Sequence, residues 1–178
     1  MANFKMGSQT VFTQTDDNRP IYSSGVPAGT VLNVVSSSKT DIQTFTSTNT
    51  FTTINGLSCT ITPKSTSNKI LIMGHLSVGN NTNTARNICQ LFRDSTQVGL
   101  GNDGGSGQAR AMSATDTRTY EQRSIPINFL DSPSTTSPIT YTVKLASGSQ
   151  PYHVNRDGED GANNTRCICT LTVMEIAG

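Results

Sequence analysis

From Gly29 onward, the sequence is a succession of short, Thr- and Val-rich segments separated by polar turns. Apolar and polar residues alternate over residues 57–61 and again over residues 139–145, which is the period of a half-buried strand. No segment carries apolar residues at the spacing of an amphipathic helix. The pattern predicts an all-β fold: a two-sheet β-sandwich of jelly-roll type, with a barrel as the alternative.

The composition agrees with this fold class. Charged residues make up 14% of the 178-residue chain, against about 25% in an ordinary soluble domain. Hydrophobic residues are 33% and Trp is absent, which suits a thin sandwich because only alternate strand residues face inward. The net charge of +1 offers no electrostatic attraction to nucleic acid or anionic lipid. We therefore expect no nucleic-acid partner.

Residues 69–78 form the most apolar segment of the chain. Alternate residues from Ile70 to Val78 can face one core, which leaves Leu71 and Met73 to contact something on the other side of the strand. The uninterrupted hydrophobic run within it, residues 70–73, is far shorter than the roughly 20 residues of a membrane-spanning helix. We expect no membrane insertion, and a second buried surface for this strand.

The remaining strand and turn predictions follow from the same alternation. Asn55-Gly56 is predicted to be a turn, and residues 99–107 and 156–164 are predicted to be polar loops. The other predicted strands are residues 30–35, 45–54, 85–92, 97–98, 118–130 and 167–176.

Residues 1–28 differ from the rest of the chain. They contain two prolines and the Asp16-Asp17-Asn18 cluster, with no sustained periodicity. Prolines and the residues before them favour extended backbone. We predict an extended N-terminal arm over residues 1–28 that attaches to a partner or joins copies of the chain, followed by one β-sandwich domain over residues 29–178. An unstructured terminus is the alternative.

Motifs for catalysis and cofactor binding are weak. Gly99, Gly101 and Gly104 have the spacing of a dinucleotide-binding turn, but no helix pattern follows them. No nucleophile motif is present, and no pair of acids is placed for glycoside hydrolysis. The sequence therefore predicts no catalytic residues, no cofactor and no enzymatic activity. A small hydrolase using Asp157 or Asp160 with Glu121 is the alternative.

The four cysteines are interpreted as small buried hydrophobic residues. Cys167 and Cys169 are two apart on a predicted strand and would share one face, so a zinc site with Cys59 and Cys89 is the alternative. The spacing is not that of a zinc knuckle, and we expect no metal.

His153 is followed by Arg156, Asp157, Glu159 and Asp160. Oxygen ligands of that cluster could hold a divalent cation, although the spacing is not that of an EF-hand. A solvated polar turn is the favoured interpretation.

Several short motifs occur in a characteristic order along the chain. They are residues 29–35 (GTVLNVV), 39–41 (KTD), 57–63 (LSCTITP), 65–71 (STSNKIL), 91–95 (LFRDS), 129–133 (FLDSP), 140–143 (TYTV), 155–157 (NRD) and 172–176 (TVMEI). Their succession resembles a family of tail-fibre and virion-associated β-sandwich proteins of marine phages, including cyanophages. The resemblance covers most of the chain from Gly29.

This resemblance implies a structural protein of a bacteriophage virion, assembled in the host cytoplasm. It implies a tail fibre or fibre tip involved in host attachment, present as a homotrimer and joined to other phage structural proteins by the N-terminal arm. Capsid decoration, or a head-fibre protein without receptor binding, is the alternative. If host surface glycan is bound, the predicted contacts lie in the two polar loops: Asn102, Asp103, Arg156, Asp157 and Asp160.

Overall fold

The computed structural model describes residues 3–14, 20–22, 26–82, 84–162 and 164–178, and none of these residues is helical. Accordingly, no helix suited to crossing a membrane occurs within these ranges. The strands are β1 (Asn3–Met6), β2 (Gln9–Gln14), β3 (Pro20–Tyr22), β4 (Val31–Lys39), β5 (Gln43–Phe45), β6 (Thr52–Ile61), β7 (Lys69–Asn80), β8 (Ala85–Arg93), β9 (Thr96–Val98), β10 (Ser113–Thr117), β11 (Gln122–Asp131), β12 (Ile139–Ser147), β13 (Tyr152–Val154) and β14 (Cys169–Ile176).

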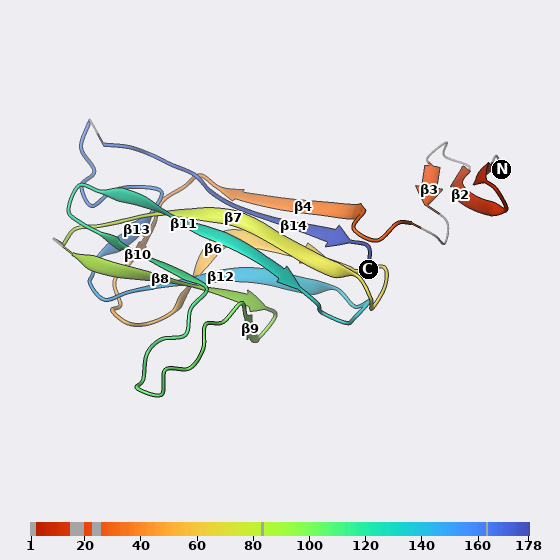
Figure 1. Cartoon of the computed structure of the whole chain (residues 1–178). Coiled ribbons are helices and arrows are strands. Elements are labelled where there is room, and N and C mark those ends of the chain that lie inside the picture. The colour runs from red at the N-terminus through yellow and green to blue at the C-terminus, as the bar shows by residue number, and fades with distance from the viewer. Residues whose placement is uncertain (1–2, 15–19, 23–25, 83, 163) are drawn as a thin grey trace.

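Two antiparallel sheets pack face to face from β4 onward (Figure 1). One sheet has the strand order β4-β14-β7-β11, and the other has the order β6-β12-β8-β10. The chain crosses between the sheets at every step along these strands except from β8 to β10. This connectivity is the two-Greek-key jelly roll, and the predicted all-β sandwich is confirmed.

The sheet that contains β7 divides into two branches along one edge of that strand. On its other edge, β7 pairs with β11 over nearly its full length. On the divided edge, β14 pairs with β7 as far as His75, and β13 pairs with β7 from Val78 onward. The outer strands follow the same division, since β4 pairs with β14 and β5 pairs with β13. We call this the forked sheet.

Asn155 occupies the fork between the two branches. Its backbone N–H donates to the carbonyl of Ser77 at 2.9 Å. Its side-chain amide donates to the carbonyls of Lys39 and Asp41 at 2.8 and 2.9 Å, where the chain passes from β4 to β5. Its φ of 66° lies in the left-handed region, which Asn tolerates better than most residues. Asn155 therefore connects both branches and the edge of the sheet.

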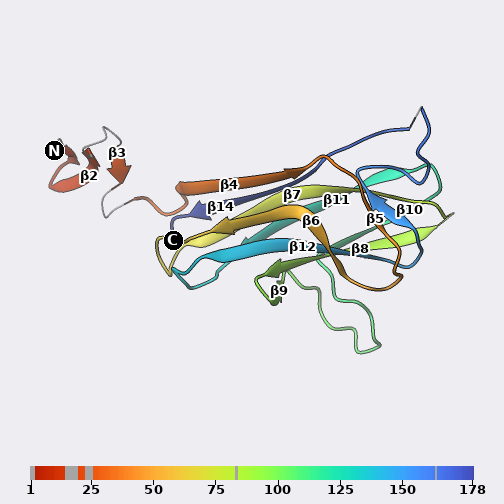
Figure 2. The ribbon, with the colours of Figure 1, turned by 180° about the vertical axis from the view of Figure 1, so that it is seen from behind.

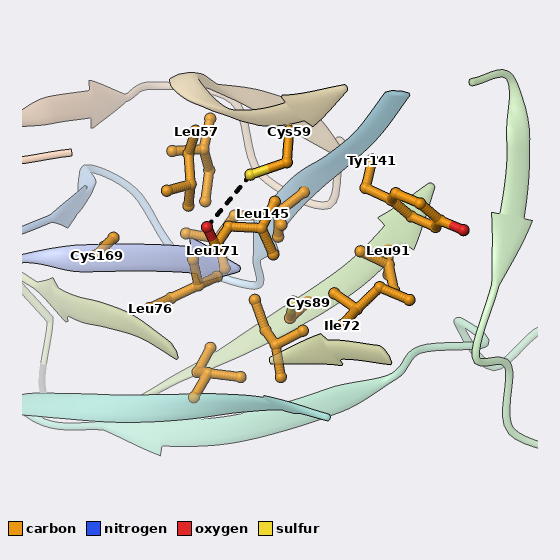
Figure 3. Packing of buried hydrophobic residues seen from close by; sticks show 14 of the residues in the cluster. Leu57, Cys59, Ile72, Leu76, Cys89, Leu91, Tyr141, Leu145, Cys169 and Leu171 are labelled. Carbon is orange, nitrogen blue, oxygen red and sulfur yellow. Dashed lines mark hydrogen bonds between the residues drawn. The ribbon is translucent and has the colours of Figure 1, made fainter. Parts of the chain in front are cut away.

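The core lies between the two sheets (Figure 3). As predicted, alternate residues of β7 face inward, with Ile72 and Leu76 fully buried. Opposite them lie Leu91 of β8 and Leu145 of β12. Burying each such side chain contributes roughly 1.5–3 kcal/mol relative to exposure, so the alternation seen in the sequence directly builds this core.

The prediction of a turn at Asn55-Gly56 is wrong. Both residues lie inside β6, and Gly56 has a φ of 76°. The register with β12 shifts at this level, between Thr142 and Lys144. The glycine therefore accommodates a β-bulge, because the pairing with β12 continues on both sides of it.

Two predicted strands also have different limits. Residues 45–54 contain the end of β5, a loop and the start of β6. Residues 118–130 begin with a turn at 118–121, where Tyr120 has a φ of 66°, and β11 starts only at Gln122. The sequence pattern missed β10 and β13 because neither carries a sustained apolar alternation.

The described residues up to Tyr22, within the predicted arm, form a small antiparallel sheet, β1-β2-β3. Figures 1 and 2 show it set apart from the sandwich. The pairing of Met6 with Gln9 leaves Gly7 and Ser8 as a two-residue loop, with Gly7 at a φ of 65°. This is a hairpin turn that a Gly-Ser pair favours. The cluster at residues 16–18 lies outside the described residues.

Candidate functional site

The outer face of the forked sheet is almost free of charge. By register, the outward positions on β4, β14, β7 and β11 carry aliphatic, hydroxyl, amide and imidazole groups. Within these four strands, Lys69 at one end of β7 is the only charged residue at an outward register position. Arg123, near the opposite end of β7, is at an inward register position, but its side chain is exposed. Soluble sheets normally protect an exposed face and its edges with Lys and Glu, so this face has the composition of an interface.

Four apolar residues pair across this face in one continuous line. Val34 lies opposite Met174, Met174 opposite Leu71, and Leu71 opposite Leu130. We call these four residues the apolar row. Val34 is 52% exposed and Leu130 is 49% exposed, and the adjacent Met73 is 43% exposed. The sequence prediction that Leu71 and Met73 face away from the core is confirmed.

The outer face of the second sheet has a different character. Arg86 and Asp116 form an ion pair across β8 and β10 at 3.6 Å. Lys144 of β12 lies over the ring of Phe92, with its Nζ 4.0 Å from the ring centroid. The segment between β9 and β10 also contacts this sheet, because Gln90 donates to the carbonyl of Arg110 at 2.8 Å. Charged side chains with partners are thus present on the outer face of the second sheet, whereas the outward register positions of the forked sheet carry almost none.

A groove of about 500 Å³ lies at the other end of the uncharged face, where the fork opens. The pairing of β14 with β7 ends at Thr170 and His75. Residues 165–168, which precede β14, do not pair with β7, and the groove lies between them and β7. We call this depression the fork groove. Its lining is His75, Ser77, Gln122, Arg123, Ser124, Thr165, Cys167 and Ile168.

Hydrogen bonds fix two of the polar side chains of the fork groove. Oε1 of Gln122 accepts from the hydroxyl of Thr165 at 2.7 Å and from the thiol of Cys167 at 3.2 Å. Nδ1 of His75 lies 3.1 Å from the hydroxyl of Thr170. No sequence pattern indicated this groove, because its residues come from three separated segments that only the fork brings together.

The first predicted ligand loop projects from the side of the second sheet, between β9 and β10 (Figure 1). Asn102 and Asp103 are both exposed. The Asp103 carboxylate accepts from the N–H of Gly105 at 2.9 Å, which is a local turn interaction. The glycines at 99, 101 and 104 lie in this loop with no helix behind them, as predicted.

The second predicted ligand loop is held together by its own polar side chains. Asp157 is 6% exposed, and its carboxylate accepts from the N–H of Glu159 at 3.1 Å and from the side chain of Asn164 at 2.9 Å. Arg156 pairs with Asp160 at 3.2 Å, and Asp160 also pairs with Arg166. Figures 1 and 2 show this loop and the first one at different places on the molecule. Ligand contact by either loop stays a prediction.

His153 is buried and neutral rather than part of a solvated turn. It is 1% exposed, and its Nε2 lies 2.8 Å from the guanidinium of Arg156, which can only donate. The imidazole proton is therefore on Nδ1, which lies 3.0 Å from the hydroxyl of Thr44. Oδ1 of Asn81 lies 2.9 Å from the same Nε2; with Nε2 accepting from Arg156, we assign this amide the opposite orientation, with its amino group toward the ring. Burial, helped by Arg156, lowers the pKa of His153 to about 4.

All four cysteines are free thiols, and three of them are buried. Burial raises the pKa of Cys89 to about 12 and that of Cys169 to about 11. Cys167 is exposed and precedes β14, so the prediction that it shares a strand face with Cys169 is wrong. Within the described ranges, no three His, Cys, Asp or Glu side chains gather in a metal-binding group.

The fold and the candidate site define a jelly-roll β-sandwich with one uncharged, partly apolar face. No family model matches the sequence, and no curated protein matches it. The resemblance to a phage family therefore stays a prediction.

Among solved structures, the chain is similar to one from infectious bursal disease virus, Gx strain, with a TM-score of 0.46 and 11% identity, over 99% of this chain and 50% of that one. It is similar to the infectious bursal disease virus VP2 subviral particle, with a TM-score of 0.44 and 14% identity, over 92% and 40% of the two chains. A disulfide-linked pilus of Bacillus endospores matches with a TM-score of 0.34 and 13% identity, over 89% and 100%. The chain spans about half the length, or less, of the viral chains it matches.

Proposed function

We propose that this chain is a structural subunit of a bacteriophage particle, present as a homotrimer at a tail fibre or fibre tip and involved in host attachment. The observation that carries the proposal is the apolar row on an otherwise uncharged sheet face of a jelly roll. The order of the sequence motifs supports the phage assignment. The jelly-roll fold is compatible with it but is used by many proteins. The proposed role requires no catalysis.

Self-association through the apolar row and the adjacent Met73 follows from the free-energy cost of leaving these side chains in water. Val34, Leu130 and Met73 each gain on the order of 1 kcal/mol when their exposed portions are covered. No like charges oppose one another across this face, because Lys69 lies at its end. Three copies with their rows turned toward a threefold axis would bring these side chains together in a closed assembly.

The oligomeric state tests this step. Sedimentation equilibrium of the full chain is expected to give three times the chain mass of 19.0 kDa. Leu130→Asp should dissociate the trimer, because it places a carboxylate in the apolar contact. Ser58→Asp is the matched control, since Ser58 is exposed on the second sheet. A monomeric wild-type chain would contradict the proposal.

Position on the particle tests the attachment role. Gold-labelled antibody against residues 29–178 is expected to mark the tail of intact particles in electron micrographs. Deletion of residues 1–28 should prevent incorporation while leaving the sandwich folded, because the small sheet of β1, β2 and β3 lies apart from it.

Capsid decoration without receptor binding is the second candidate. Jelly rolls are common in viral capsid proteins, and the same apolar row would serve a subunit on the head. Label over the head rather than the tail would favour this role and remove host attachment from the proposal.

A further inference from the structure

We propose that the fork groove is a binding site for a neutral saccharide. The inference rests on the proposed attachment function and deepens it, because it names the site and the class of ligand. It uses residues that lie outside both loops in which the sequence predicted glycan contacts.

The fork gives the groove a rigid floor. Ser77 lies between the last β14 contact and the first β13 contact of β7, and it is 6% exposed. Its N–H donates to the thiol of Cys169 at 3.2 Å and its carbonyl accepts from Asn155 at 2.9 Å. The backbone of the floor is thus fully engaged, which leaves side chains to bind a ligand. A site held on strands keeps its geometry better than one held on loops.

The lining matches a polyhydroxylated, uncharged ligand. Its walls carry the hydroxyls of Ser77, Ser124 and Thr165, the amide of Gln122 and the imidazole of His75. These groups donate and accept hydrogen bonds without carrying a fixed charge, as sugar hydroxyls require. A volume near 500 Å³ lies within the range of small-molecule sites.

The charge balance argues against an anionic ligand. Arg123 is the one lining residue with a permanent positive charge, and its Nε is paired with Glu121 at 3.0 Å. A phosphate or sulfate would have to compete with that carboxylate. A neutral sugar does not, so the pair can stay intact when the groove is filled.

Gln122 has an unused donor that a sugar would satisfy. Its Oε1 is held by Thr165 and Cys167, while its Nε2 is shielded and has no hydrogen-bond partner among the described residues. An unpartnered buried donor is costly. To reach a ligand hydroxyl in the groove, the amide would have to turn and exchange its bonds to Thr165 and Cys167, and a partner for Nε2 would offset that exchange. Gln122 is therefore the residue whose loss should weaken binding most.

Ile168 supplies an apolar element beside these polar groups. It is 39% exposed and lines the groove. The ring C–H groups of a sugar present an apolar face that gains from covering such a side chain. Together with the hydroxyl and amide groups, this gives the mixed lining that binds and orients small ligands.

Saturation-transfer NMR on the full chain tests the inference, with glucose, galactose, mannose and N-acetylglucosamine as the probes. At least one is expected to bind with a millimolar dissociation constant, which suits a ligand of this size. Chemical shifts of the Gln122 side-chain amide should move with the same constant. Gln122→Ala should weaken binding about five- to tenfold, the loss of one hydrogen bond.

Two further variants separate the groove from general effects. Ser124→Ala removes a lining hydroxyl at an exposed position and should also weaken binding, even if Gln122→Ala does not fold. Asn128→Ala lies on the same face of β11 outside the groove and should leave binding unchanged. The inference is overturned if no sugar binds at roughly 20 mM, well above the constants expected, or if Ser124→Ala binds as tightly as wild type. The inference is also overturned if the chemical shift of the Gln122 side-chain amide moves on addition of sulfate but not on addition of any of the sugars.

The two proposals fail in different experiments. Gold label on the tail without sugar binding would leave the attachment role and remove this site. Sugar binding without label on any particle would keep the site and remove the particle assignment.

Discussion

Arg93 and Asp131 form an ion pair with two hydrogen bonds that joins the two sheets of the sandwich. Nη1 of Arg93, at the end of β8, donates to both carboxylate oxygens of Asp131 on β11, at 2.9 and 2.8 Å. The hydroxyl of Tyr141 on β12 donates to the same carboxylate at 2.7 Å. Burial and the Asp131 charge raise the pKa of Tyr141 well above its usual value. The three groups act as one polar cross-link at the edge of the core.

Removing parts of this cross-link should destabilise the fold by unequal amounts. Asp131→Ala leaves Arg93 without its partner and is expected to cost about 3–5 kcal/mol. Tyr141→Phe removes one hydrogen bond to a charged group and should cost about 1.5–3 kcal/mol. Urea unfolding of both variants and of the double variant measures the coupling. Additive losses would show that the tyrosine and the aspartate act independently.

Asn155 provides a test of the fork. Asn155→Ala should cost about 2–4 kcal/mol, because it loses the bonds to Lys39 and Asp41 and strains a φ of 66°. Asn155→Gly keeps the backbone conformation and should cost about 1 kcal/mol less. Thermal unfolding distinguishes the two effects. Equal losses in both variants would place the whole contribution in the side-chain bonds.

His153 should make stability depend on pH in the acid range. Its pKa is about 4 in the folded protein, against 6.5 for the free side chain. Between these values the unfolded chain binds a proton that the folded one does not, so stability falls as the pH drops from about 6.5 to 4 and levels off below. The shift corresponds to a loss on the order of 3 kcal/mol.

The slope of the free energy of unfolding against pH, rather than its absolute value, reports on His153. His153→Gln should flatten the dependence between pH 6.5 and 4, measured by urea unfolding at several pH values. His75→Gln, which removes the other histidine in the chain, is the control and should retain the slope. An unchanged slope in His153→Gln would assign the acid sensitivity to carboxylates instead.

The thiols should differ in reactivity. Cys167 is exposed, whereas Cys59, Cys89 and Cys169 are buried, and burial raises the pKa of each of these three. A thiolate is the reactive form, so a disulfide reagent should modify one thiol in the folded chain and all four after denaturation. In Cys167→Ser, the folded chain should not react. Rapid reaction of a second thiol in the wild type would indicate local opening of the core.

The sandwich could be predicted from the sequence because the alternation that marks a half-buried strand is a local pattern. Alternation in residues 69–78 and 139–145 identifies inward-facing residues directly, and those assignments hold in the structure. Asn55-Gly56 misled the same reasoning, because a glycine with positive φ serves a bulge as well as a turn. The choice between the two depends on whether the partner strand continues, which a local pattern does not contain.

The candidate site could be predicted only in part. Leu71 and Met73 revealed an apolar outer face because they lie on one strand. Val34, Met174 and Leu130 joined them only through the strand order, which brings distant segments into register. The fork groove had no sequence signal, since β13 is three residues long and its place beside β7 arises from tertiary packing.

The two branches of the forked sheet differ in the length of their pairing with β7. β14 joins β7 over seven residue pairs, whereas β13 joins it over three. The register of the apolar row therefore depends on the longer branch, and residues 159–168 take no part in the pairing that sets it. Sequence changes at the groove end are therefore expected to alter the groove without shifting the register of the apolar row.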